Sequence, residues 1–502
     1  MCDEMIDENK NKSWLTMFHT TVKENGNLIA VICGEQKITY HELDKKSSRI
    51  AQSLIKLGIQ KNDIVGILMN RSIDLIASIL GIVKAGATLL PLDTTYPQKR
   101  IRYILRDSKC RFLFVKKSES EEIEFDGTTI GLEDVIQGET DEMGYDVDLN
   151  SILYILYTSG STGNPKGVMI SNLAFESFIK GITSNIDFMK YQKALAVTTI
   201  SFDIAFLELL VPLTRQMTVV LADTRVASNP RLLINYIKTQ EVDIIQMTPT
   251  RMMLLLECVG NQDWLRSVTT ILIGGESFSQ KLLELLQKRK NTRIFNLYGP
   301  TEATIWVSAG DLTNESTIHI GRPFCDVQIY IVDEQGNVVP DGEIGEIYIA
   351  GNQLSSGYVN QLELTKRNFI QSGWDQKLLL YRTGDLGVVL PDGTIICKGR
   401  LDEQVKVRGY RIELNEVIQT LMKYPEIKNA TVLALDGKND TKYLIAYYVA
   451  DKKLADEKIR AFLGNYLPFY MIPERFIFMS RLPETLNQKI DKKGLMEVLK
   501  EE

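Results

Sequence analysis

The chain has 502 residues, which is long enough for two or more domains. Hydrophobic residues make up 44% of the sequence, enough to fill a large core, and this excludes a mainly disordered chain. The 58 Lys and Arg residues are outnumbered by 64 Asp and Glu residues, so the basic excess that is typical of a nucleic-acid-binding protein is missing.

The cysteines and histidines exclude several kinds of site. Six cysteines are scattered singly without a C-x-x-C pair, and only three histidines occur, which argues against zinc binding, thioredoxin-like chemistry and a Ser-His-Asp triad. Single cysteines are typical of a reducing compartment. The acidic first residues do not resemble a signal peptide, and no apolar run is long enough to span a membrane. We therefore expect a cytoplasmic protein that binds neither a membrane nor nucleic acid.

The first part of the chain alternates apolar runs with helical patterns. Residues 63–69, 87–91 and 111–115 are predicted strands, and 72–84 and 101–105 are predicted helices. A second series predicts strands near 196–199, 218–222, 243–247, 270–273 and 293–297. Alternation of this kind favours parallel sheets covered by helices on both faces, so two stacked αβ subdomains are expected.

The pattern changes after residue 317. Short strands are predicted at 328–332, 345–350, 387–390 and 394–397, separated by Asp-Gly turns, which indicates a small β-barrel-like subdomain. From residue 405 a strand–helix–strand–strand–helix order suits an α+β unit. The predicted fold is therefore α/β, with a large N-terminal domain (1–402) and a small α+β C-terminal domain (403–502).

A loop at residues 157–167 carries the strongest chemical signal. Its sequence YTSGSTGNPKG follows an apolar run, Ile152 to Leu156, that reads as a buried strand. Glycines let backbone N–H groups face a ligand, and hydroxyls and a lysine suit phosphate oxygens. It is not the common P-loop, because Pro165 precedes the lysine and Gly167 follows it. A flexible surface loop is the other interpretation.

This loop and nine further segments resemble the amino-acid adenylation domains of nonribosomal peptide synthetases, within the adenylate-forming, AMP-binding superfamily. The segments occur in the family's order and cover nearly the whole chain: ITYHEL at 38–43, VKAGATLLPLD at 83–93, FD at 202–203, NLYGPTE at 296–302, GEIYIAG at 345–351, YRTGDL at 381–386, GRLDEQVKVRGYRIEL at 399–414, LPFYMIP at 467–473 and NQKIDK at 487–492.

The resemblance implies a ligase that uses ATP and Mg²⁺. Such an enzyme activates an amino acid as aminoacyl-AMP with release of pyrophosphate. It then transfers the aminoacyl group to the phosphopantetheine thiol of a carrier protein or domain. Because an in-line attack on the α-phosphate must position two anions and neutralise growing charge, cations and oxygen donors are needed at the site.

The family's nucleotide site is carried over residue by residue. The phosphate-loop residues would hold the β- and γ-phosphates: Thr158, Ser159, Ser161, Thr162 and Lys166. Thr301 would contact the α-phosphate, and Glu302 would hold Mg²⁺, which prefers oxygen ligands. Tyr298 would stack on adenine and Asn296 would bind its edge. Asp385 would accept the ribose hydroxyls, with Arg400 as a further nucleotide contact.

Lys489 is the expected catalytic lysine, bridging the substrate carboxylate and the α-phosphate. Asp402 and Lys406 match the hinge about which the C-terminal domain of the family rotates between its two half-reactions. Three positions depart from the family's pattern: Gln488 replaces a glycine, Lys492 an arginine, and Cys397 an aromatic residue near the adenine.

Asp203 matches the aspartate that pairs with the substrate ammonium in amino-acid-activating relatives. The remaining pocket positions of the family fall on Ile204, Leu207, Gln246, Leu272, Gly274, Leu297, Ile305 and Trp306. Together with Asp203 and Lys489 they resemble the family's pattern for glycine. The bulky lining and the single small residue, Gly274, agree with a small substrate, and alanine is the nearest competitor. Each apolar residue taken singly could equally be core.

Two alternatives remain at this stage. One is a D-alanine–carrier protein ligase, although that family carries a cysteine in the segment 273–276 and has a different hinge motif. The other is a catalytically silent adenylate-binding protein, although Glu302, Asp385 and Lys489 are all present. No carrier or condensation motif is visible, so we expect either a stand-alone adenylation enzyme or a part of a larger synthetase.

Overall fold

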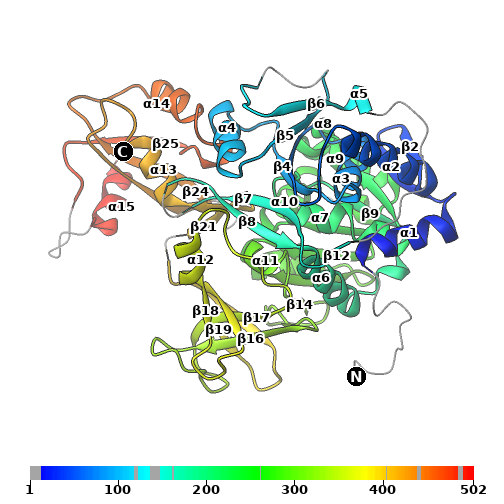
Figure 1. Cartoon of the computed structure of the whole chain (residues 1–502). Helices are drawn as coiled ribbons and strands as arrows, with labels where there is room; N and C mark the ends of the chain where they lie inside the picture. Colours follow the sequence, from blue (N-terminus) through cyan, green and yellow to red (C-terminus); the bar gives the residue numbers. More distant parts are fainter. Residues whose placement is uncertain are drawn as a thin grey trace. The chain divides into compact units, whose positions relative to one another are not determined.

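The structure is a computed structural model (Figure 1), and it describes residues 13–117, 123–135, 147–160, 163–260, 262–402, 404–437, 442–483 and 490–501. The chain divides into two compact units. The larger contains the described residues of Met1–Thr94, Leu105–Leu156 and Gly167–Leu401, and the smaller contains those of Thr95–Ile104, Tyr157–Lys166 and Asp402–Glu502.

The first predicted series of strands forms a mainly parallel sheet. The described strands are ordered β6-β5-β3-β4-β7-β8. Their bounds are β3 Ile64–Leu68, β4 Thr88–Leu92, β5 Phe112–Val115, β6 Thr128–Gly131, β7 Ile152–Thr158 and β8 Lys166–Ser171. The helices of this region are α1 Trp14–Asn25, α2 Tyr40–Lys56, α3 Ile73–Lys84, α4 Gln98–Asp107 and α5 Leu132–Val135.

The predicted helix at 72–84 is α3, and its start and packing follow from two small residues. The Ser72 hydroxyl accepts a hydrogen bond from the Leu75 amide and caps the first turn. A Cβ atom on Gly81 would lie 2.6 Å from Cγ2 of Ile50, so the glycine permits the close approach of α3 to α2. The serine thus fixes the start of the helix, and the glycine allows it to pack closely on α2.

The second series forms a larger sheet, in the order β15-β14-β13-β12-β11-β9-β10-β1-β2. Its strands are β1 Ile29–Cys33, β2 Gln36–Thr39, β9 Lys193–Ala196, β10 Thr218–Leu221, β11 Ile244–Met247, β12 Thr270–Gly274, β13 Arg293–Tyr298, β14 Ser308–Asp311 and β15 Arg322–Pro323. Its helices are α6 Asn172–Asn185, α7 Ile204–Leu209, α8 Thr224–Ser228, α9 Pro230–Gln240, α10 Pro249–Val259 and α11 Gln280–Gln287.

Two features of this sheet differ from the sequence prediction. The strand predicted near 196–199 is wrong in position, because β9 ends at Ala196. The amides of Val197 and Thr198 donate instead to the buried carboxylate of Glu208. In addition β1, from the N-terminal part of the chain, pairs in parallel with β10 and extends the sheet.

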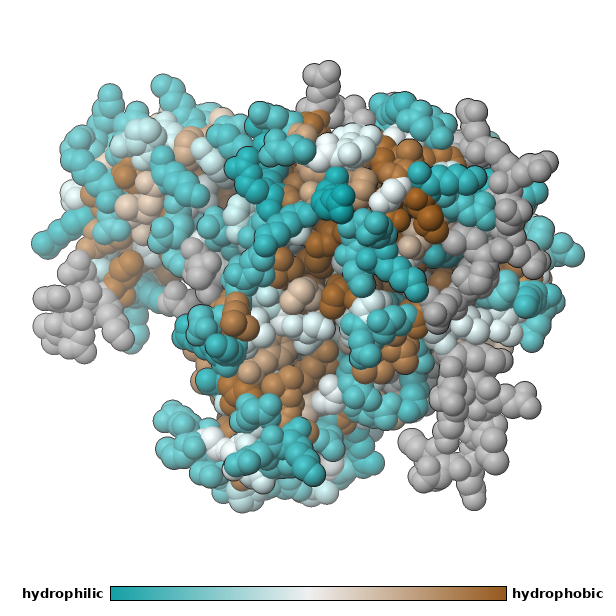
Figure 2. Space-filling view, viewed as in Figure 1, coloured by the Kyte–Doolittle hydropathy of each residue, from teal (hydrophilic) through white to brown (hydrophobic). Residues whose placement is uncertain are grey.

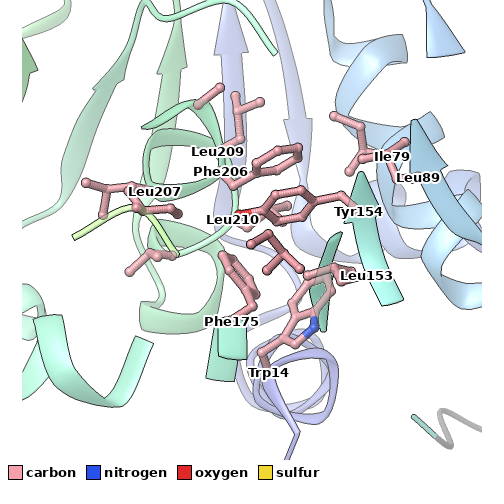
Figure 3. Packing of buried hydrophobic residues seen from close by; sticks show 14 of the residues in the cluster. Trp14, Ile79, Leu89, Leu153, Tyr154, Phe175, Phe206, Leu207, Leu209 and Leu210 are labelled. Carbon is pink, nitrogen blue, oxygen red and sulfur yellow. The ribbon is translucent and has the colours of Figure 1, made fainter. Parts of the chain in front are cut away.

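Aromatic side chains from several elements pack together in the core of the larger unit (Figure 3). Tyr154 of β7 stacks on Phe206 of α7, with ring centroids 4.3 Å apart and planes 18° apart. Trp14 meets Phe175 edge to face at 5.6 Å, and its indole N–H donates to Asn172. Because Phe206 is anchored in this way, helix α7 is held in a fixed position.

The short strands after residue 317 form a separate β subdomain within the larger unit. Its strands are β16 Val327–Val332, β17 Gly345–Gly351, β18 Phe369–Gln371, β19 Leu379–Val389 and β20 Ile395–Arg400, with helix α12 Leu362–Asn368. They pair in the order β16-β17-β19-β18, and β20 lies beside β19. The barrel-like subdomain expected from the sequence is this five-stranded sheet, and the strand predicted at 387–390 is the end of the longer β19.

The smaller unit has the expected α+β character. A hairpin of β21 Gln404–Val407 and β22 Tyr410–Glu413 leads into α13 Leu414–Leu421. Strands β23 Asn429–Asp436, β24 Lys442–Val449 and β25 Arg475–Met479 form a three-stranded sheet, with α14 Asp456–Leu463 and α15 Lys492–Glu501. The segments 95–104 and 157–166 belong to the same compact unit.

The surface is mixed in polarity. Figure 2 shows hydrophilic residues over most of the visible face, with hydrophobic residues exposed in between. In the part of the chain that the structure describes, no helix combines the length and the apolar character needed to cross a bilayer.

Candidate active site

Several of the predicted site residues of the larger unit lie where neighbouring parallel strands end. Gln246 is near the end of β11, Gly274 ends β12, and Asn296 is near the end of β13. The strand register sets Ile273 beside Asn296 and Gly274 beside Leu297. In open α/β sheets, ligands bind at the carboxyl ends of the strands. The sheet therefore gathers residues that are far apart in sequence at one edge.

Tyr298, Asp385 and Arg400 form a hydrogen-bonded group. The Tyr298 hydroxyl donates to Oδ2 of Asp385 at 2.7 Å, and Nη1 of Arg400 donates to Oδ1 at 2.6 Å. Burial, and then the Asp385 carboxylate, raises the pKa of Tyr298 well above its usual value, so the phenol stays protonated and remains a donor. Each carboxylate oxygen keeps a second lone pair, so Asp385 can still accept hydroxyl groups of a ligand.

Asp385 lies on strand β19 and is fixed there from its backbone as well. Its amide donates to the hydroxyl of Thr383 at 2.9 Å, and that hydroxyl donates to the carbonyl of Ile347 at 2.7 Å. Arg400 also donates to the carbonyl of Thr383. The carboxylate is therefore held rigidly between β17, β19 and β20.

Asn296 uses part of its amide within the protein. Its Nδ2 donates to the carbonyl of His319 at 3.0 Å, and Nδ1 of His319 accepts the amide of Gly321. Asn296 is 5% exposed. A ligand at this position would have to use the second N–H of the amide or its oxygen. His319 thus contributes to the structure through its carbonyl and its ring nitrogen.

The turn between Glu302 and Trp306 has an unusual backbone. Thr304 and Ile305 adopt positive φ angles of 57° and 67°, a conformation that β-branched residues rarely take. The hydroxyl of Thr304 donates to the carbonyl of Gln353 at 2.7 Å, and Nε2 of Gln353 donates to the carbonyl of Trp306 at 2.9 Å. Gln353 is completely buried and holds the turn in this conformation. Gln353 was not predicted. The only signal for it in the sequence is that it lies two residues after the motif at 345–351.

Glu302 is completely buried at the start of this turn. Its Oε1 accepts the hydroxyl of Tyr358 at 2.9 Å, and Nδ2 of Asn368 donates to that hydroxyl at 2.9 Å. Among the described residues no group of three or more His, Cys, Asp or Glu side chains could hold a metal. A single carboxylate nevertheless suits Mg²⁺, which is usually held by one or two carboxylates together with substrate phosphates and water.

Asp203 lies at the start of α7, with its side chain 7% exposed. Its Oδ1 accepts the amide of Ile204 at 2.8 Å. The hydroxyl of Tyr154 is buried, and within the described residues it has no hydrogen-bond partner. Burial, and then the nearby Asp203 carboxylate, raises the pKa of Tyr154 well above its usual value. Tyr154 was read from the sequence only as part of an apolar strand, and the structure places it in the electrostatic environment of Asp203.

Trp306 packs closely against Gly274, another of the predicted pocket residues. A Cβ atom on Gly274 would lie 2.7 Å from Cη2 of Trp306 and 2.9 Å from the carbonyl oxygen of Leu297. A Cβ atom on Gly275 would lie 3.5 Å from Cγ2 of Thr248 and 3.8 Å from Cδ1 of Ile204. These side chains therefore surround the same two glycines. Thr248 was not predicted. It comes directly after the strand predicted at 243–247, and the apolar pattern of that strand gave no sign of a role for the next residue.

The remaining predicted pocket residues are all buried. Leu207, Leu272, Leu297 and Ile305 are between 1% and 3% exposed and belong to the main hydrophobic cluster. Gln246 is 4% exposed. In the amide orientation that satisfies both ends, its Nε2 donates to Glu208 at 3.2 Å and its Oε1 accepts the amide of Met247 at 3.3 Å. Its polar atoms are thus used inside the protein.

The predicted phosphate loop belongs to the smaller unit. Ser159 is 4% exposed, and its hydroxyl donates to the carbonyl of Arg411 at 2.9 Å and accepts the amide of Glu413 at 3.2 Å. The buried hydroxyl of Thr158 has no hydrogen-bond partner among the described residues, and Lys166 is 5% exposed. Ser161, Thr162 and Lys489 lie outside the described residues. At the hinge positions, Asp402 accepts the amide of Gln404, and Lys406 pairs with Arg411 across the hairpin.

Comparisons with known proteins agree on one family. The model of the AMP-binding enzyme matches residues 18–359, and the model of the AMP-binding enzyme C-terminal domain matches residues 416–489. Surfactin synthase subunit 3 of Bacillus subtilis is 36% identical over 496 residues, which cover 95% of this chain and 38% of that protein. The chain thus spans well under two thirds of the length of this relative.

Two solved structures are similar to the chain. The four-domain nonribosomal peptide synthetase AB3403, bound to AMP and glycine, is 31% identical, with 96% of this chain and 36% of that one covered and a TM-score of 0.72. The o-succinylbenzoate CoA synthetase of Bacillus subtilis is 24% identical and shares the fold, with a TM-score of 0.85 over 97% of this chain and 98% of that one. The chain therefore belongs to the AMP-binding enzymes, a family of AMP-forming ligases that includes the adenylation domains of nonribosomal peptide synthetases.

Proposed function

We propose that the chain activates glycine with ATP and passes the glycyl group to a carrier protein. In the first step a carboxylate oxygen of glycine attacks the α-phosphorus, and the bond to the leaving pyrophosphate breaks. In the second step a phosphopantetheine sulfur attacks the glycyl carbonyl, and the bond to AMP breaks. The observation that carries the choice of glycine is the contact between Gly274 and Trp306.

The nucleotide roles follow the groups described above. Asp385, fixed by Tyr298 and Arg400, accepts the ribose hydroxyls, and Asn296 with Tyr298 binds the adenine. Thr301 contacts the α-phosphate, and the phosphate loop with Lys166 holds the β- and γ-phosphates. When Mg²⁺ is bound, it neutralises phosphate charge. Glu302, oriented by Tyr358, is the residue that holds it.

Asp203 is the proposed partner of the substrate ammonium. It is buried, and its charge contributes, after burial, to the raised pKa of Tyr154, which is also buried. An ammonium group suits a buried carboxylate, because it supplies both a positive charge and hydrogen bonds. Lys489 then bridges the substrate carboxylate and the α-phosphate in the step that forms the adenylate.

The preference for glycine rests on excluded volume. Trp306 lies so close to residue 274 that even a methyl group there would clash, and Ile204 and Thr248 fill the neighbouring space. The amide of Gln246 hydrogen-bonds to Glu208 and to the backbone of Met247, so it is not available to bind a polar side chain of the substrate. The glycine bound to AB3403, at 31% identity, is in line with this choice. A pocket excludes a larger side chain effectively by steric clash. It rejects a smaller one poorly, because a missing methylene group costs only about 1–3 kcal/mol of binding free energy.

The second half-reaction needs a change in the site, because pyrophosphate must leave before a thiol enters. We assign residues 1–402 to ATP and amino-acid binding, and residues 403–502 to a mobile domain that carries Lys489 and turns about Asp402 and Lys406. The phosphopantetheinylated carrier is the partner. We place the reaction in the cytoplasm, in line with the cysteines, since none of the five described ones is in a disulfide bond.

Direct detection of the products tests this proposal. The purified chain is incubated with ATP, Mg²⁺ and glycine, and the products are separated by mass spectrometry. Glycyl-AMP and pyrophosphate, followed by glycyl thioester when a phosphopantetheinylated carrier is added, are the expected products. Formation of ADP, or adenylate with D-alanine but not with glycine, would contradict the proposal.

A further inference from the structure

The loop between strand β9 and helix α7 leads directly to Asp203, the proposed partner of the substrate ammonium. Within this loop, residues 197–203, two hydroxyl groups share one acceptor. Oδ2 of Asp93 accepts the hydroxyl of Thr199 at 2.7 Å and that of Ser201 at 3.2 Å. The backbone amide of Phe202 donates to the carbonyl of Thr199 at 3.1 Å. Asp93 ends the motif at 83–93, and the proposed function gives it no role.

Asp93 reaches the loop from the first sheet. It directly follows β4, which pairs in parallel with β3. Three residues after β3, Nε of Arg71 donates to the carbonyl of Ala222 at 2.6 Å and Nη2 to that of Ala196 at 2.7 Å. Nη1 of the same guanidinium donates to the carbonyl of Thr198. Residues that follow two neighbouring strands of the first sheet thus hold the segment that follows β9.

The start of the loop is held by Glu208 of α7. Its Oε2 accepts the amides of Val197 and Thr198, both at 2.7 Å, and its Oε1 accepts the hydroxyl of Thr198 at 2.6 Å. In the orientation that satisfies its amide, the pocket residue Gln246 also donates to Glu208 at 3.2 Å. The loop is therefore tied to the predicted amino-acid pocket at its start and to the first sheet further along.

The groups that hold the loop are charged. Burial lowers the pKa of Arg71 to about 10, and the carboxylates of Glu208 and Asp93 oppose this shift, so the guanidinium stays charged at neutral pH. Hydrogen bonds to ionised groups are roughly twice as strong as those between neutral groups. Two carboxylates and one guanidinium, from three separate elements, therefore favour a single conformation of the loop.

We propose that Asp93 is a positioning residue of the amino-acid site: it holds Thr199 and Ser201, and thereby sets where the carboxylate of Asp203 meets the substrate ammonium. This inference rests on the proposed function, since it takes Asp203 to be the partner of the ammonium. Asp93 acts through the loop and not by contact with the substrate. The attraction within a buried charge pair depends on its geometry, so a displaced Asp203 binds the ammonium less well.

Two stable analogues of the acyl-adenylate isolate this effect. Both are adenosine sulfamates; one carries a glycyl group and the other an acetyl group, which lacks only the amino group. The ratio of their dissociation constants therefore measures the contribution of the ammonium. The wild-type chain should bind the glycyl compound about 100-fold more tightly. In Asp93→Ala this preference should fall about tenfold, because Asp203 is no longer held in place, and the affinity for the acetyl compound should not change.

Variants on the loop show whether the effect passes through the two hydroxyls. The double variant Thr199→Val with Ser201→Ala should lose the same part of the preference, and adding Asp93→Ala to it should change nothing further. Asp93→Asn, whose amide oxygen still accepts a hydroxyl, should keep more of the preference than Asp93→Ala. The matched control is Asp392→Ala. Asp392 accepts the hydroxyl of Thr394 at 2.7 Å in an exposed turn between β19 and β20, so its loss should leave the preference intact.

Isothermal titration calorimetry on the full chain gives both affinities, and thermal unfolding checks the fold. A folded Asp93→Ala that keeps the wild-type preference, or that loses affinity for both compounds equally, would overturn the proposal. If Asp93→Ala does not fold, the double variant of Thr199 and Ser201 must show the loss of preference, and an unchanged preference there would equally overturn it.

Asp203→Asn separates this inference from the proposed function. If Asp203→Asn keeps the preference for the glycyl compound, the proposed ammonium site itself is wrong. If Asp203→Asn loses the preference and Asp93→Ala keeps it, only the positioning role of Asp93 fails. A wild-type chain that binds neither compound would contradict the proposed function.

Discussion

Gly274 and Trp306 are in direct apposition, since a Cβ atom on residue 274 would lie 2.7 Å from Cη2 of the indole. The glycine ends a parallel strand, and the tryptophan follows a turn whose left-handed residues are held by the buried amide of Gln353. The backbone of Trp306 is therefore fixed by a long-range hydrogen bond from Gln353. We infer that the indole limits the size of the proposed amino-acid pocket, and this leads to the first prediction.

Shortening Trp306 should widen the substrate range. In Trp306→Ala the vacated volume admits a substrate side chain, so the ratio of kcat/KM for glycine to that for alanine should fall by about tenfold or more. Burial of the indole means that unfolding also becomes easier by about 3–5 kcal/mol. Trp306→Phe, which keeps most of the volume, is the milder control. An unchanged amino-acid profile in a folded Trp306→Ala would place the indole in the core rather than in the pocket.

Removal of the charge on Asp203 should raise the KM for glycine. Asparagine is as good a helix N-cap as aspartate, so Asp203→Asn keeps the contact with the Ile204 amide and the fold. Loss of one partner of a buried charge pair costs about 3–5 kcal/mol, so the KM should rise more than about 100-fold. The KM for ATP should not change.

Asp223 provides the control, since it caps helix α8 by accepting the amide of Val226 at 2.7 Å and is not part of the proposed site. Asp223→Asn should leave both KM values unchanged. If the two variants behave alike in steady-state kinetics, Asp203 does not bind the ammonium.

Loss of the Tyr358 hydroxyl should weaken metal binding. Tyr358 donates to Glu302 and is itself held by Asn368, so it orients the carboxylate proposed to hold Mg²⁺. Partners of metal ligands typically affect metal affinity by 10- to 100-fold, so Tyr358→Phe should raise the Mg²⁺ concentration needed for half-maximal activity by about tenfold. The KM for glycine serves as the internal reference. A Mg²⁺ dependence equal to that of the wild type would show that Tyr358 does not orient a metal ligand.

The stability of the protein should depend on pH through Glu208. Burial raises the pKa of this carboxyl, although the hydroxyl and amide of Thr198 and the amide of Val197 oppose the shift. The folded state then binds the proton more tightly than the unfolded state, so the free energy of unfolding falls as pH rises from the usual Glu value through the raised pKa.

Glu208→Gln cannot titrate and lacks this decline. The unfolding free energy of the wild type minus that of the variant should therefore fall with rising pH. The fall should be about 1.4 kcal/mol for each pH unit inside that window. Urea denaturation at a series of pH values measures it, with the exposed Glu284→Gln as control. A difference that is independent of pH would mean that the pKa of Glu208 is not raised.

The sequence predicted the elements of the fold because their patterns are local. The periodicity of α3 and the apolar runs of β3 and β11 can each be recognised from a few consecutive residues. It did not predict that β1 joins β10, or that β9 ends at Ala196, because both depend on partners far along the chain. Glu208, for example, draws the amides after β9 away from the sheet.

The same limit applies to the candidate site. Its motif residues could be named from resemblance, but Tyr154, Thr248 and Gln353 could not, since each acts through a contact with a distant segment. The left-handed backbone of Thr304 and Ile305 was also hidden, because β-branched residues normally avoid it. Only the folded chain shows that Gln353 holds this conformation.

The central claim is that this chain adenylates glycine, and amino-acid-dependent exchange of labelled pyrophosphate into ATP tests it most directly. The panel should contain glycine, L-alanine, D-alanine, serine, leucine, phenylalanine, aspartate and lysine, together with a reaction without amino acid. The account predicts the highest kcat/KM for glycine, a weaker second value for alanine, and no exchange above background for the large and charged amino acids. A preference for any amino acid larger than serine, or exchange with none of the panel, would contradict it.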